Sequence, residues 1–361
     1  MSLKSDIVAV TKNTDEKYIK RAIKIAKNGL GYTAPNPTVG AIIVCNHKII
    51  GEGFTSPFGG HHAEVNAIES VQNKSLLVKS TLYVTLEPCS HYGKTPPCAD
   101  LILKYGIPKV VIGILDPNKK VSGKGYKKLK EAGVTVTLGV LEKECRTHHK
   151  RFLSFQEKER PYIILKWAET KDGFIAPDPK ERKKNPSPFW ISNTVSRQLV
   201  HKWRGEEQAI LVGTNTAIAD NPKLNTRNWK GKSPTRILLD RTLKVTPNHH
   251  ILDDAAPTII ITETANTNQY IEGILYEVID FSQHIAAQIC TVLHKHQITS
   301  LIIEGGTQTL QTFIDAHLWD EARIFKGNTF FKKGIKAPQI SKGPKTTQKI
   351  KTDTLTYIYN D

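Results

Sequence analysis

Cysteine is scarce in this chain of 361 residues, which contains only Cys45, Cys89, Cys98, Cys145 and Cys290. Five cysteines are few, and an odd number cannot all pair. This argues against a disulfide framework and favours reduced thiols, some of which can bind metal. A run of about 18 apolar residues, which a membrane-spanning helix needs, is also missing. The N-terminal sequence MSLKSDIVAV lacks the long apolar segment of a secretory signal. We therefore expect a cytoplasmic protein with no membrane partner.

Acidic residues are in the minority, 34 against 51 lysines and arginines, so the formal net charge is +17. Such a charge fits nucleic-acid binding, an anionic small substrate or merely a lysine-rich surface. The basic residues are scattered except in residues 331–351, where no aromatic residue is interleaved beyond Phe331. We therefore expect a small molecule as the partner and no nucleic acid.

The chain is long enough for two domains, because a single core rarely grows beyond about 250 residues, although one domain remains possible. The polar stretch RFLSFQEKERP precedes a new apolar run, YIILKWA. Because such stretches commonly separate domains, we place the first domain at residues 1–152 and the second at 153–361.

Helical and strand-like patterns alternate along both halves. Helices are predicted at 15–28, 62–71, 98–106 and 125–132, and strands at 39–45, 48–53, 81–86, 109–115, 134–140, 162–168, 236–240, 258–262, 276–280 and 300–306. The composition of residues 177–189 predicts a solvated loop. Helices and strands that alternate in this way predict a layered α/β fold for each half.

One histidine and two cysteines form the strongest chemical pattern. His62-Ala63-Glu64 opens a predicted helix, and Cys89 and Cys98 follow within the string EPCSHYGKTPPC. An imidazole and two thiolates leave the fourth tetrahedral position of Zn²⁺ open, as a catalytic site requires. Zinc lowers the pKa of water at that position to about 7, and a carboxylate that is not a ligand can move protons. We assign that proton transfer to Glu64, in agreement with the H-x-E and P-C-x-x-C pattern of zinc deaminases.

Eight residues lie between the two cysteines, whereas that pattern has two residues between them. The longer segment predicts a loop held at the metal by both ends, which carries His91 and Lys94 over the pocket. A structural zinc with His61 or His91 as fourth ligand is the main alternative, but it leaves Glu64 without a role.

The strings APNPTVGAIIV, HAEVNAI and TLEPCSHYGKTPPCA resemble the bifunctional deaminase/reductase family of riboflavin biosynthesis. The resemblance implies a cytidine-deaminase-like three-layer α/β/α domain that hydrolytically deaminates 2,5-diamino-6-(5-phosphoribosylamino)pyrimidin-4-one with zinc. It also implies that Asn36 holds the pyrimidine, while His91 and Lys94 contact the ring or the phosphate. Thr55 departs from the family, in which many members have a histidine at this position.

RPYIILKWAETKDGFIA, the stretch from WISNTVSRQLVHKWRG to NPKLNTR, and LIIEGGTQTL resemble the reductase domain of the same family, which has a dihydrofolate-reductase-like α/β fold. The resemblance implies NADPH-dependent reduction of the ribosyl group to ribityl. It assigns Ala168, Trp190, Thr216, Asp220 and Gly306 to the NADPH site, and Lys166, Arg204, Leu224, Arg227 and Glu304 to the substrate.

From the residues alone, the glycines of ILVGTNT and LIIEGGTQTL suit phosphate-binding turns, but neither forms a GxGxxG dinucleotide fingerprint. Pro188 departs from the family, which usually has a serine there, and Ser187 is the candidate replacement. A homo-oligomer is expected by resemblance only. Two alternatives stay open: a deaminase whose reductase half is an inactive scaffold, and a zinc-containing RNA-editing or nucleic-acid-binding protein.

Overall fold

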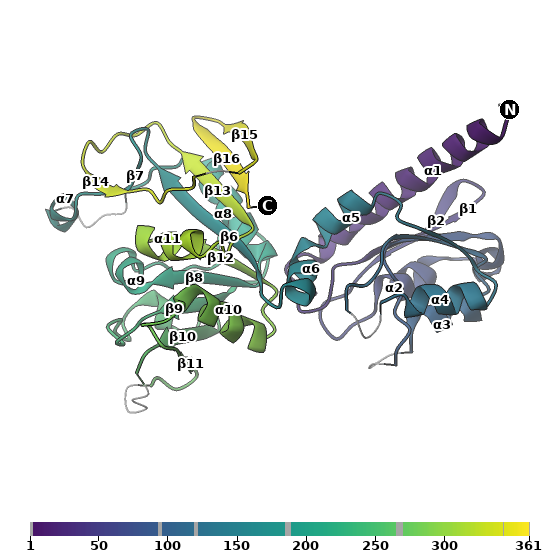
Figure 1. The fold of residues 1–361 in the computed structure, drawn as a ribbon, viewed down its shortest axis with the longest axis horizontal. Coiled ribbons are helices and arrows are strands. Elements are labelled where there is room, and N and C mark those ends of the chain that lie inside the picture. The colour runs from purple at the N-terminus through teal and green to yellow at the C-terminus, as the bar shows by residue number, and fades with distance from the viewer. Residues whose placement is uncertain are drawn as a thin grey trace. The chain divides into compact units, whose positions relative to one another are not determined.

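A computed structural model of the chain contains two compact units, Met1–Lys158 and Glu159–Asp361 (Figure 1). It describes residues 3–92, 96–118, 122–184, 189–264, 270–341 and 343–360. The boundary expected after residue 152 lies inside helix α6 (Lys150–Glu157), whose Leu153 packs into the core of the first unit. Within the described ranges, no helix has the length and apolar character that crossing a membrane requires.

The first unit is a five-stranded sheet between two layers of helices. The strand order is β2-β1-β3-β4-β5; β1 runs antiparallel to β2 and β3, and β3, β4 and β5 are parallel. Helices α1 and α5 cover one face, and α2, α3 and α4 cover the other (Figure 1). The bounds are α1 Leu3–Ala26, β1 Gly40–Cys45, β2 Lys48–Phe54, α2 Ala63–Ser70, β3 Thr81–Leu86, α3 Cys98–Lys104, β4 Lys109–Ile114, α4 Lys124–Glu131, β5 Thr135–Leu138 and α5 Glu142–His148.

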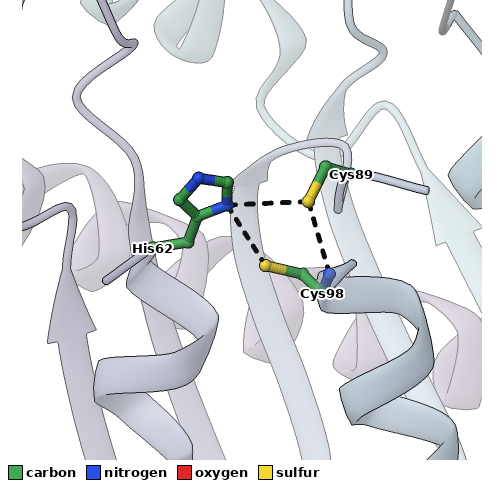
Figure 2. Close-up of side chains that lie close together, drawn as sticks. All are labelled: His62, Cys89 and Cys98. Carbon is green, nitrogen blue, oxygen red and sulfur yellow. Dashed lines mark hydrogen bonds between the residues drawn. The ribbon is translucent and has the colours of Figure 1, made fainter. Parts of the chain in front are cut away.

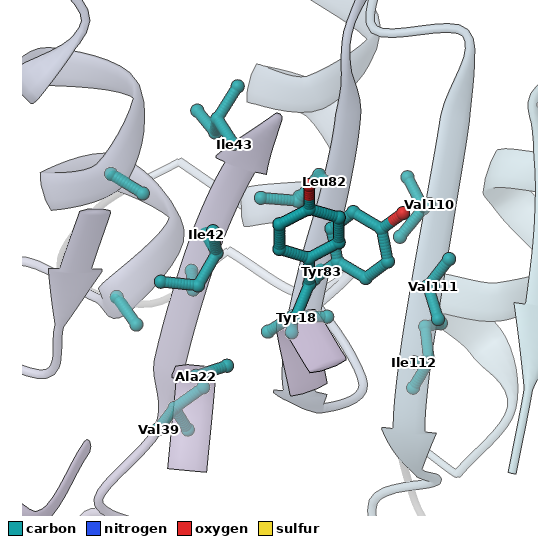
Figure 3. Packing of buried hydrophobic residues seen from close by; sticks show 14 of the residues in the cluster. Tyr18, Ala22, Val39, Ile42, Ile43, Leu82, Tyr83, Val110, Val111 and Ile112 are labelled. Atoms are coloured by element: carbon teal, nitrogen blue, oxygen red, sulfur yellow. The ribbon is translucent and has the colours of Figure 1, made fainter. Parts of the chain in front are cut away.

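The predicted strands and helices of this unit form close to where the sequence indicates them, except that helix α1 begins at Leu3 instead of residue 15. Asn46 and His47 connect β1 to β2 with φ angles of 48° and 60°, the left-handed conformation that tight hairpins favour. Helices α5 and α6 were not predicted, because short polar helices leave only a weak periodic signal. On the α1 face, the rings of Tyr18 and Tyr83 lie 4.9 Å apart within the apolar core (Figure 3).

Helix α2 packs directly on β2 because β2 contains two glycines. A Cβ atom at Gly53 would collide with the backbone of Ala63 and Ala67, and one at Gly51 would collide with the carbonyl of Ala67. The absence of side chains there lets the helix that begins beside His62 approach the sheet closely.

The second unit is built on a nine-stranded sheet of order β11-β10-β9-β8-β12-β6-β13-β16-β15, in which the pairs β13–β16 and β16–β15 are antiparallel and the other pairs are parallel. One core lies under α8 and α9, and a second core lies under α10 and α11. The bounds are β6 Tyr162–Glu169, β7 Phe174–Pro177, α7 Pro179–Lys184, α8 Thr194–Glu206, β8 Ala209–Gly213, α9 Thr214–Asp220, β9 Thr235–Leu239, β10 Thr258–Thr262, β11 Leu275–Val278, α10 Ile285–Lys295, β12 Ser300–Glu304, α11 Thr307–Asp315, β13 Glu321–Lys326, β14 Gly334–Lys336, β15 Lys345–Ile350 and β16 Asp353–Tyr359.

The segment predicted as a solvated loop at 177–189 contains regular secondary structure. It contains the end of β7, which pairs with β14, and the short helix α7. The loop prediction was therefore wrong for residues 179–184, which form the six-residue helix α7 although their composition is rich in lysine. Pro188 and Ser187 lie outside the described residues.

Candidate active sites

Several chain segments of the first unit meet at one edge of its sheet. Strand β1 begins where β2 ends, because Gly40 pairs with Phe54, and it runs antiparallel to β3. The parallel strands β3 and β4 end together, with Leu86 paired to Ile114. This edge therefore collects residues 30–39, 55–62, 87–92 and 115–118, which include most of the candidate residues.

The three candidate metal ligands lie together at this edge (Figure 2). The Nδ1 atom of His62 is 3.6 Å from the Sγ of Cys89 and 3.3 Å from the Sγ of Cys98. His62 immediately precedes α2, and Cys98 is the first residue of α3. The backbone N–H of Cys98 donates to the Cys89 sulfur at 3.3 Å, so the start of α3 favours a thiolate at Cys89.

The donor set fits Zn²⁺ in number, chemistry and spacing. Bonds of about 2.0–2.1 Å to nitrogen and about 2.3 Å to sulfur, at tetrahedral angles, place a nitrogen and a sulfur ligand ~3.6 Å apart. The ligand atoms of the three residues all lie within 4.8 Å of one another, and no fourth His, Cys, Asp or Glu of the described ranges joins that group. An open position for a substrate or water therefore remains.

Glu64 lies beside these ligands in the first turn of α2 and is only 3% exposed. Burial and, to a smaller extent, the nearby Cys89 sulfur raise the pKa of its carboxyl group to about 7, while His62 opposes them. The hydrogen bond with Cys98 and the contact with His62 lower the pKa of Cys89 to about 4, whereas the pKa of Cys98 is raised by its bond to Cys89 and by burial. A buried carboxyl group that titrates near neutral pH suits proton transfer.

The candidate substrate residues of this unit have different environments. Asn36 is half-buried in the segment before β1, and its backbone N–H donates to the carbonyl of Thr33 at 2.9 Å. His91 is exposed. Lys94 lies outside the described residues. Thr55 is buried, and its hydroxyl accepts the N–H of Val39 at 2.9 Å, so this residue joins two segments of the site edge.

Asp116 was not singled out in the sequence. It follows β4, and burial raises the pKa of its carboxyl group. The charges of Glu87 and Cys89 also raise this pKa, whereas the charge of His91 lowers it. Its position beside the cysteine ligand follows from the parallel pairing of β3 and β4, which a scan for local motifs does not reveal.

In the second unit, three candidate residues form one ion cluster. Lys166 on β6 and Glu304 on β12 are paired in register, and their Nζ and Oε2 atoms are 3.6 Å apart. Arg204 on α8 donates to both oxygens of Glu304, at 2.7 and 3.1 Å. Burial opposes ionisation of Glu304, but the charges of Arg204 and Lys166 outweigh it and lower its pKa to about 2. Burial lowers the pKa of Lys166 despite the Glu304 charge.

The remaining substrate candidates extend this cluster. Arg204 donates to the carbonyl of Asn225 at 3.3 Å, and Arg227 donates to the side chain of the same residue at 3.1 Å. Leu224 is buried, has a φ of 54° and directly precedes Asn225, the residue to which both arginines donate. His201, which the sequence did not single out, lies 3.0 Å from the Asn225 carbonyl, and burial together with the two arginines lowers its pKa to about 4.

Two of the five NADPH candidates lie in contact. A Cβ atom at Gly306 would lie 3.2 Å from the Oγ1 of Thr216, so the turn after β12 rests against α9. Ala168 is partly buried near the end of β6, and Asp220 is exposed at the end of α9. Trp190 is exposed before α8, with the Arg197 guanidinium 4.5 Å from its ring centre.

A cavity of about 420 Å³ lies at the ends of β8, β9 and β10, beside Thr216 in the chain. Its lining is Thr214, Asn215, Asp240, Arg241, Thr242, Lys244 and Glu263. Sequence analysis missed this set because its members follow three different strands. The connections after the neighbouring strands β8 and β12 pack on opposite faces of the sheet. Ligands of open α/β sheets bind at such a point, which lies where the Gly306 turn meets Thr216, next to the cavity and not in it.

Comparisons with known proteins agree with this division of chemistry. The family described as "Cytidine and deoxycytidylate deaminase zinc-binding region" matches residues 12–114, and the "RibD C-terminal domain" family matches residues 161–348. The chain is similar to riboflavin biosynthesis protein RibD of Aquifex aeolicus, with 41% identity over 86% of each chain. It is similar to RibD of Escherichia coli, with 33% identity over 86% of this chain and 87% of that protein.

A solved structure of full length is also similar. It is the diaminohydroxyphosphoribosylaminopyrimidine deaminase/5-amino-6-(5-phosphoribosylamino)uracil reductase of Thermotoga maritima, with 36% identity, a TM-score of 0.87, and coverage of 97% of this chain and 100% of that one. Together these matches confirm the expected fold classes, a cytidine-deaminase-like unit followed by a dihydrofolate-reductase-like unit.

Proposed function

This chain belongs to the RibD family of riboflavin biosynthesis enzymes, and we propose how its own residues carry out the two reactions of that family. The chain is a bifunctional enzyme, a zinc-dependent deaminase and an NADPH-dependent reductase. Its substrate is the small phosphoribosyl pyrimidine, deaminated first and then reduced from ribosyl to ribityl. We propose a role for each residue of the two sites, and we propose that the two domains span residues 1–152 and 153–361.

For deamination, we assign His62, Cys89 and Cys98 as the zinc ligands. Their mutual spacing, with a fourth position open, is the observation that carries this assignment. Zinc, when bound, activates water for attack on the carbon that carries the leaving amine. Glu64 takes the proton of that water and delivers it to the departing nitrogen, a cycle that its pKa of about 7 favours.

The pyrimidine and its phosphate are bound by the loops at the same edge of the sheet. We assign the ring to Asn36, whose amide can donate and accept hydrogen bonds, and the outer part of the substrate to His91 and Lys94. The tie between Thr55 and Val39 supports the segment that carries Asn36, so a threonine at position 55 acts here as a structural residue.

Replacement of one ligand tests the metal centre. Cys89→Ala leaves two protein ligands, so bound zinc and ammonia release from the phosphoribosyl pyrimidine should both be lost. Cys45→Ala is the matched control, because Cys45 is a buried thiol on β1 outside the metal group. Metal analysis and an ammonia assay on both variants decide the assignment. Full zinc content in Cys89→Ala would contradict it.

For reduction, NADPH supplies the hydride. We propose that its nicotinamide end is bound near Ala168, Trp190 and the turn at Gly306, with Thr216 and Asp220 of α9 alongside. The ribosyl group is bound beside a cluster of charged side chains, which are Lys166, Arg204 and Glu304. The phosphate is bound by the planar guanidinium of Arg227, close in the chain to Leu224. The polar cavity beside Thr216 takes the phosphate-bearing end of the cofactor, where Arg241 and Lys244 supply positive charge.

Cofactor selectivity tests this placement. Lys244→Ala should raise KM for NADPH by about tenfold and leave KM for NADH nearly unchanged, because a charge-assisted contact to phosphate contributes about 1.5 kcal/mol or more. Lys349→Ala is the control, because Lys349 is exposed on β15, the edge strand at the opposite end of the sheet order from the cavity. Loss of NADPH absorbance on addition of the deaminated intermediate also distinguishes an active reductase from an inactive scaffold.

We further propose that the enzyme acts in the cytoplasm as a homo-oligomer and binds no nucleic acid. The cysteines are all free thiols, as expected in a reducing compartment. Several apolar side chains of the second unit are exposed, among them Trp190 at 59% and Phe330 at 58%. Light scattering tests the oligomer. An RNA-binding protein would show affinity that falls steeply with salt, whereas we expect no such binding.

A further inference from the structure

Glu87 carries no role in the account above, although it stands two residues before the ligand Cys89. It is 6% exposed and directly follows β3. Its carboxylate accepts three backbone N–H bonds: from Asp116 at 3.1 Å and Gly123 at 2.9 Å on Oε2, and from Tyr126 at 3.0 Å on Oε1. These donors come from both ends of the connection between β4 and α4 and from the first turn of α4.

The backbone of the same segment is held as tightly as the side chain. The N–H of Glu87 donates to the carbonyl of Ile114 at 2.9 Å, which extends the pairing of β3 with β4. A Cβ atom at Gly125 would collide with the carbonyl of Pro88, so α4 touches the chain directly before Cys89. Glu87 therefore lies at the centre of a contact that determines where Cys89 leaves the sheet.

We propose that Glu87 is a positioning residue of the deaminase site: its carboxylate fixes the segment that carries Cys89, and the segment that carries Asp116, to α4. The proposal rests on the deaminase function assigned above. A carboxylate is suited to this position because it only accepts hydrogen bonds, and three N–H groups converge on it. Side chains that orient metal ligands from behind commonly change metal affinity or activity by about 10- to 100-fold when replaced.

Glutamine provides a sharp substitution because it preserves size. In Glu87→Gln, the amide oxygen can accept the bonds on one side only, and the amide NH₂ must face an N–H donor on the other side. We expect zinc to be lost to a competing chelator about tenfold faster or more, and deaminase kcat to fall by a similar factor with a smaller change in KM. Reduction of the deaminated intermediate on the same chain should be unchanged. Glu87→Ala should enlarge both effects.

Asp15→Asn is the matched control, since Asp15 is a buried carboxylate of the same unit on the opposite face of the sheet, bonded to the Tyr83 hydroxyl at 2.8 Å. Hydrogen exchange adds a readout independent of activity, because the amides of Gly123 and Tyr126 should lose protection in Glu87→Gln only. If zinc release, kcat and hydrogen exchange in Glu87→Gln equal those in Asp15→Asn, the proposal for Glu87 is wrong, while the deaminase function is unaffected. An unaltered chain that neither binds zinc nor releases ammonia would overturn the deaminase function and this proposal together.

Discussion

Single side chains of the first unit have separable duties around the metal. The proposed ligands His62, Cys89 and Cys98 offer nitrogen and sulfur donors, whereas Glu64 is a buried carboxyl group that is not among them. Burial, which raises the pKa of Glu64 to about 7, lets the residue both accept and release a proton near neutral pH. Loss of Glu64 should therefore affect the chemistry and spare the metal.

Glu64→Gln is expected to lower the rate of deamination by about 10²- to 10⁴-fold, the usual contribution of general acid–base catalysis. Zinc content and reduction of the intermediate should stay unchanged. Glu69→Gln on the same helix is the control, because the Glu69 side chain is 59% exposed and pairs with His61. Ammonia release and metal analysis measure the effect. A Glu64→Gln enzyme with more than half the original rate would refute the assignment.

In the second unit, Glu304 makes stability depend on pH. Its pKa is about 2 in the folded chain against an ordinary value of 4.5, so the ionised form is stabilised by folding. The resulting stability, about 3 kcal/mol, is fully present above pH 4.5 and is lost as the pH falls from there toward 2. The buried cations Arg204 and Lys166 are the physical cause.

Glu304→Gln should flatten that part of the pH dependence and destabilise the second unit at neutral pH by about 3–5 kcal/mol, because two buried cations lose their partner. Denaturant unfolding at a series of pH values can follow the transition by tryptophan fluorescence. All five tryptophans lie in the second unit, so the signal reports on it alone. Parallel curves for the variant and the original chain between pH 5 and about 2 would contradict the linkage.

At the scale of elements, α2 is the helix that connects the sheet to the metal site. It begins after His62, carries Glu64 in its first turn, and rests on β2 where Gly51 and Gly53 leave room. At its other end, the Lys74 ammonium donates to the carbonyls of Ile68, Glu69 and Val71. A shift of this helix would thus move the proposed ligand His62 and the proposed proton carrier Glu64 together.

Gly53→Val should push α2 away from β2, because the new side chain would overlap the helix backbone. We expect a loss of about 1–3 kcal/mol of stability in the first unit, as for other overpacked positions, and faster zinc release to a chelator. Lys48→Val, at an exposed position of the same strand, is the control. Calorimetry and chelator kinetics measure the two effects. Equal zinc release in both variants would show that α2 tolerates the displacement.

At the scale of the whole molecule, the chain consists of two units, each with its own sheet and core, and each candidate site lies within one unit. The residues proposed for deamination all precede Lys158, and those proposed for reduction all follow Glu159. Two separate sites on one chain require that the intermediate leaves one and reaches the other. Diffusion through solution is sufficient for this transfer.

An equimolar mixture of Glu64→Gln and Lys166→Met chains should therefore convert the diamino substrate to the reduced product after a lag, although neither variant does so alone. The first variant retains the reductase site, and the second retains the deaminase site. Loss of NADPH absorbance after addition of substrate measures the reaction. A mixture that stays inactive, while each variant performs its remaining half-reaction, would show that the intermediate does not pass between molecules.

Local sequence patterns were sufficient for much of this architecture. Most strands of both sheets are short apolar runs, and His62, Glu64, Cys89 and Cys98 stand in a recognisable order. The polar, exposed strand β15 and the next two strands in the sheet order, β16 and β13, were not predicted. Patterns failed where the signal was weak or mixed. Helices α5 and α6 are short and polar, and α7 lies in a stretch rich in lysine and proline.

Residues near one another in the chain were enough to predict most of the element types, their order and the kinds of donor atom offered to the metal, because these features depend on local sequence. Only the tertiary structure decided which residues meet across strands. The register of β6 and β12 sets Lys166 against Glu304, the parallel ends of β3 and β4 bring Glu87 to Asp116, and three strand ends build the cavity at Arg241. Such contacts join residues far apart in sequence, and strand pairing alone sets their distance.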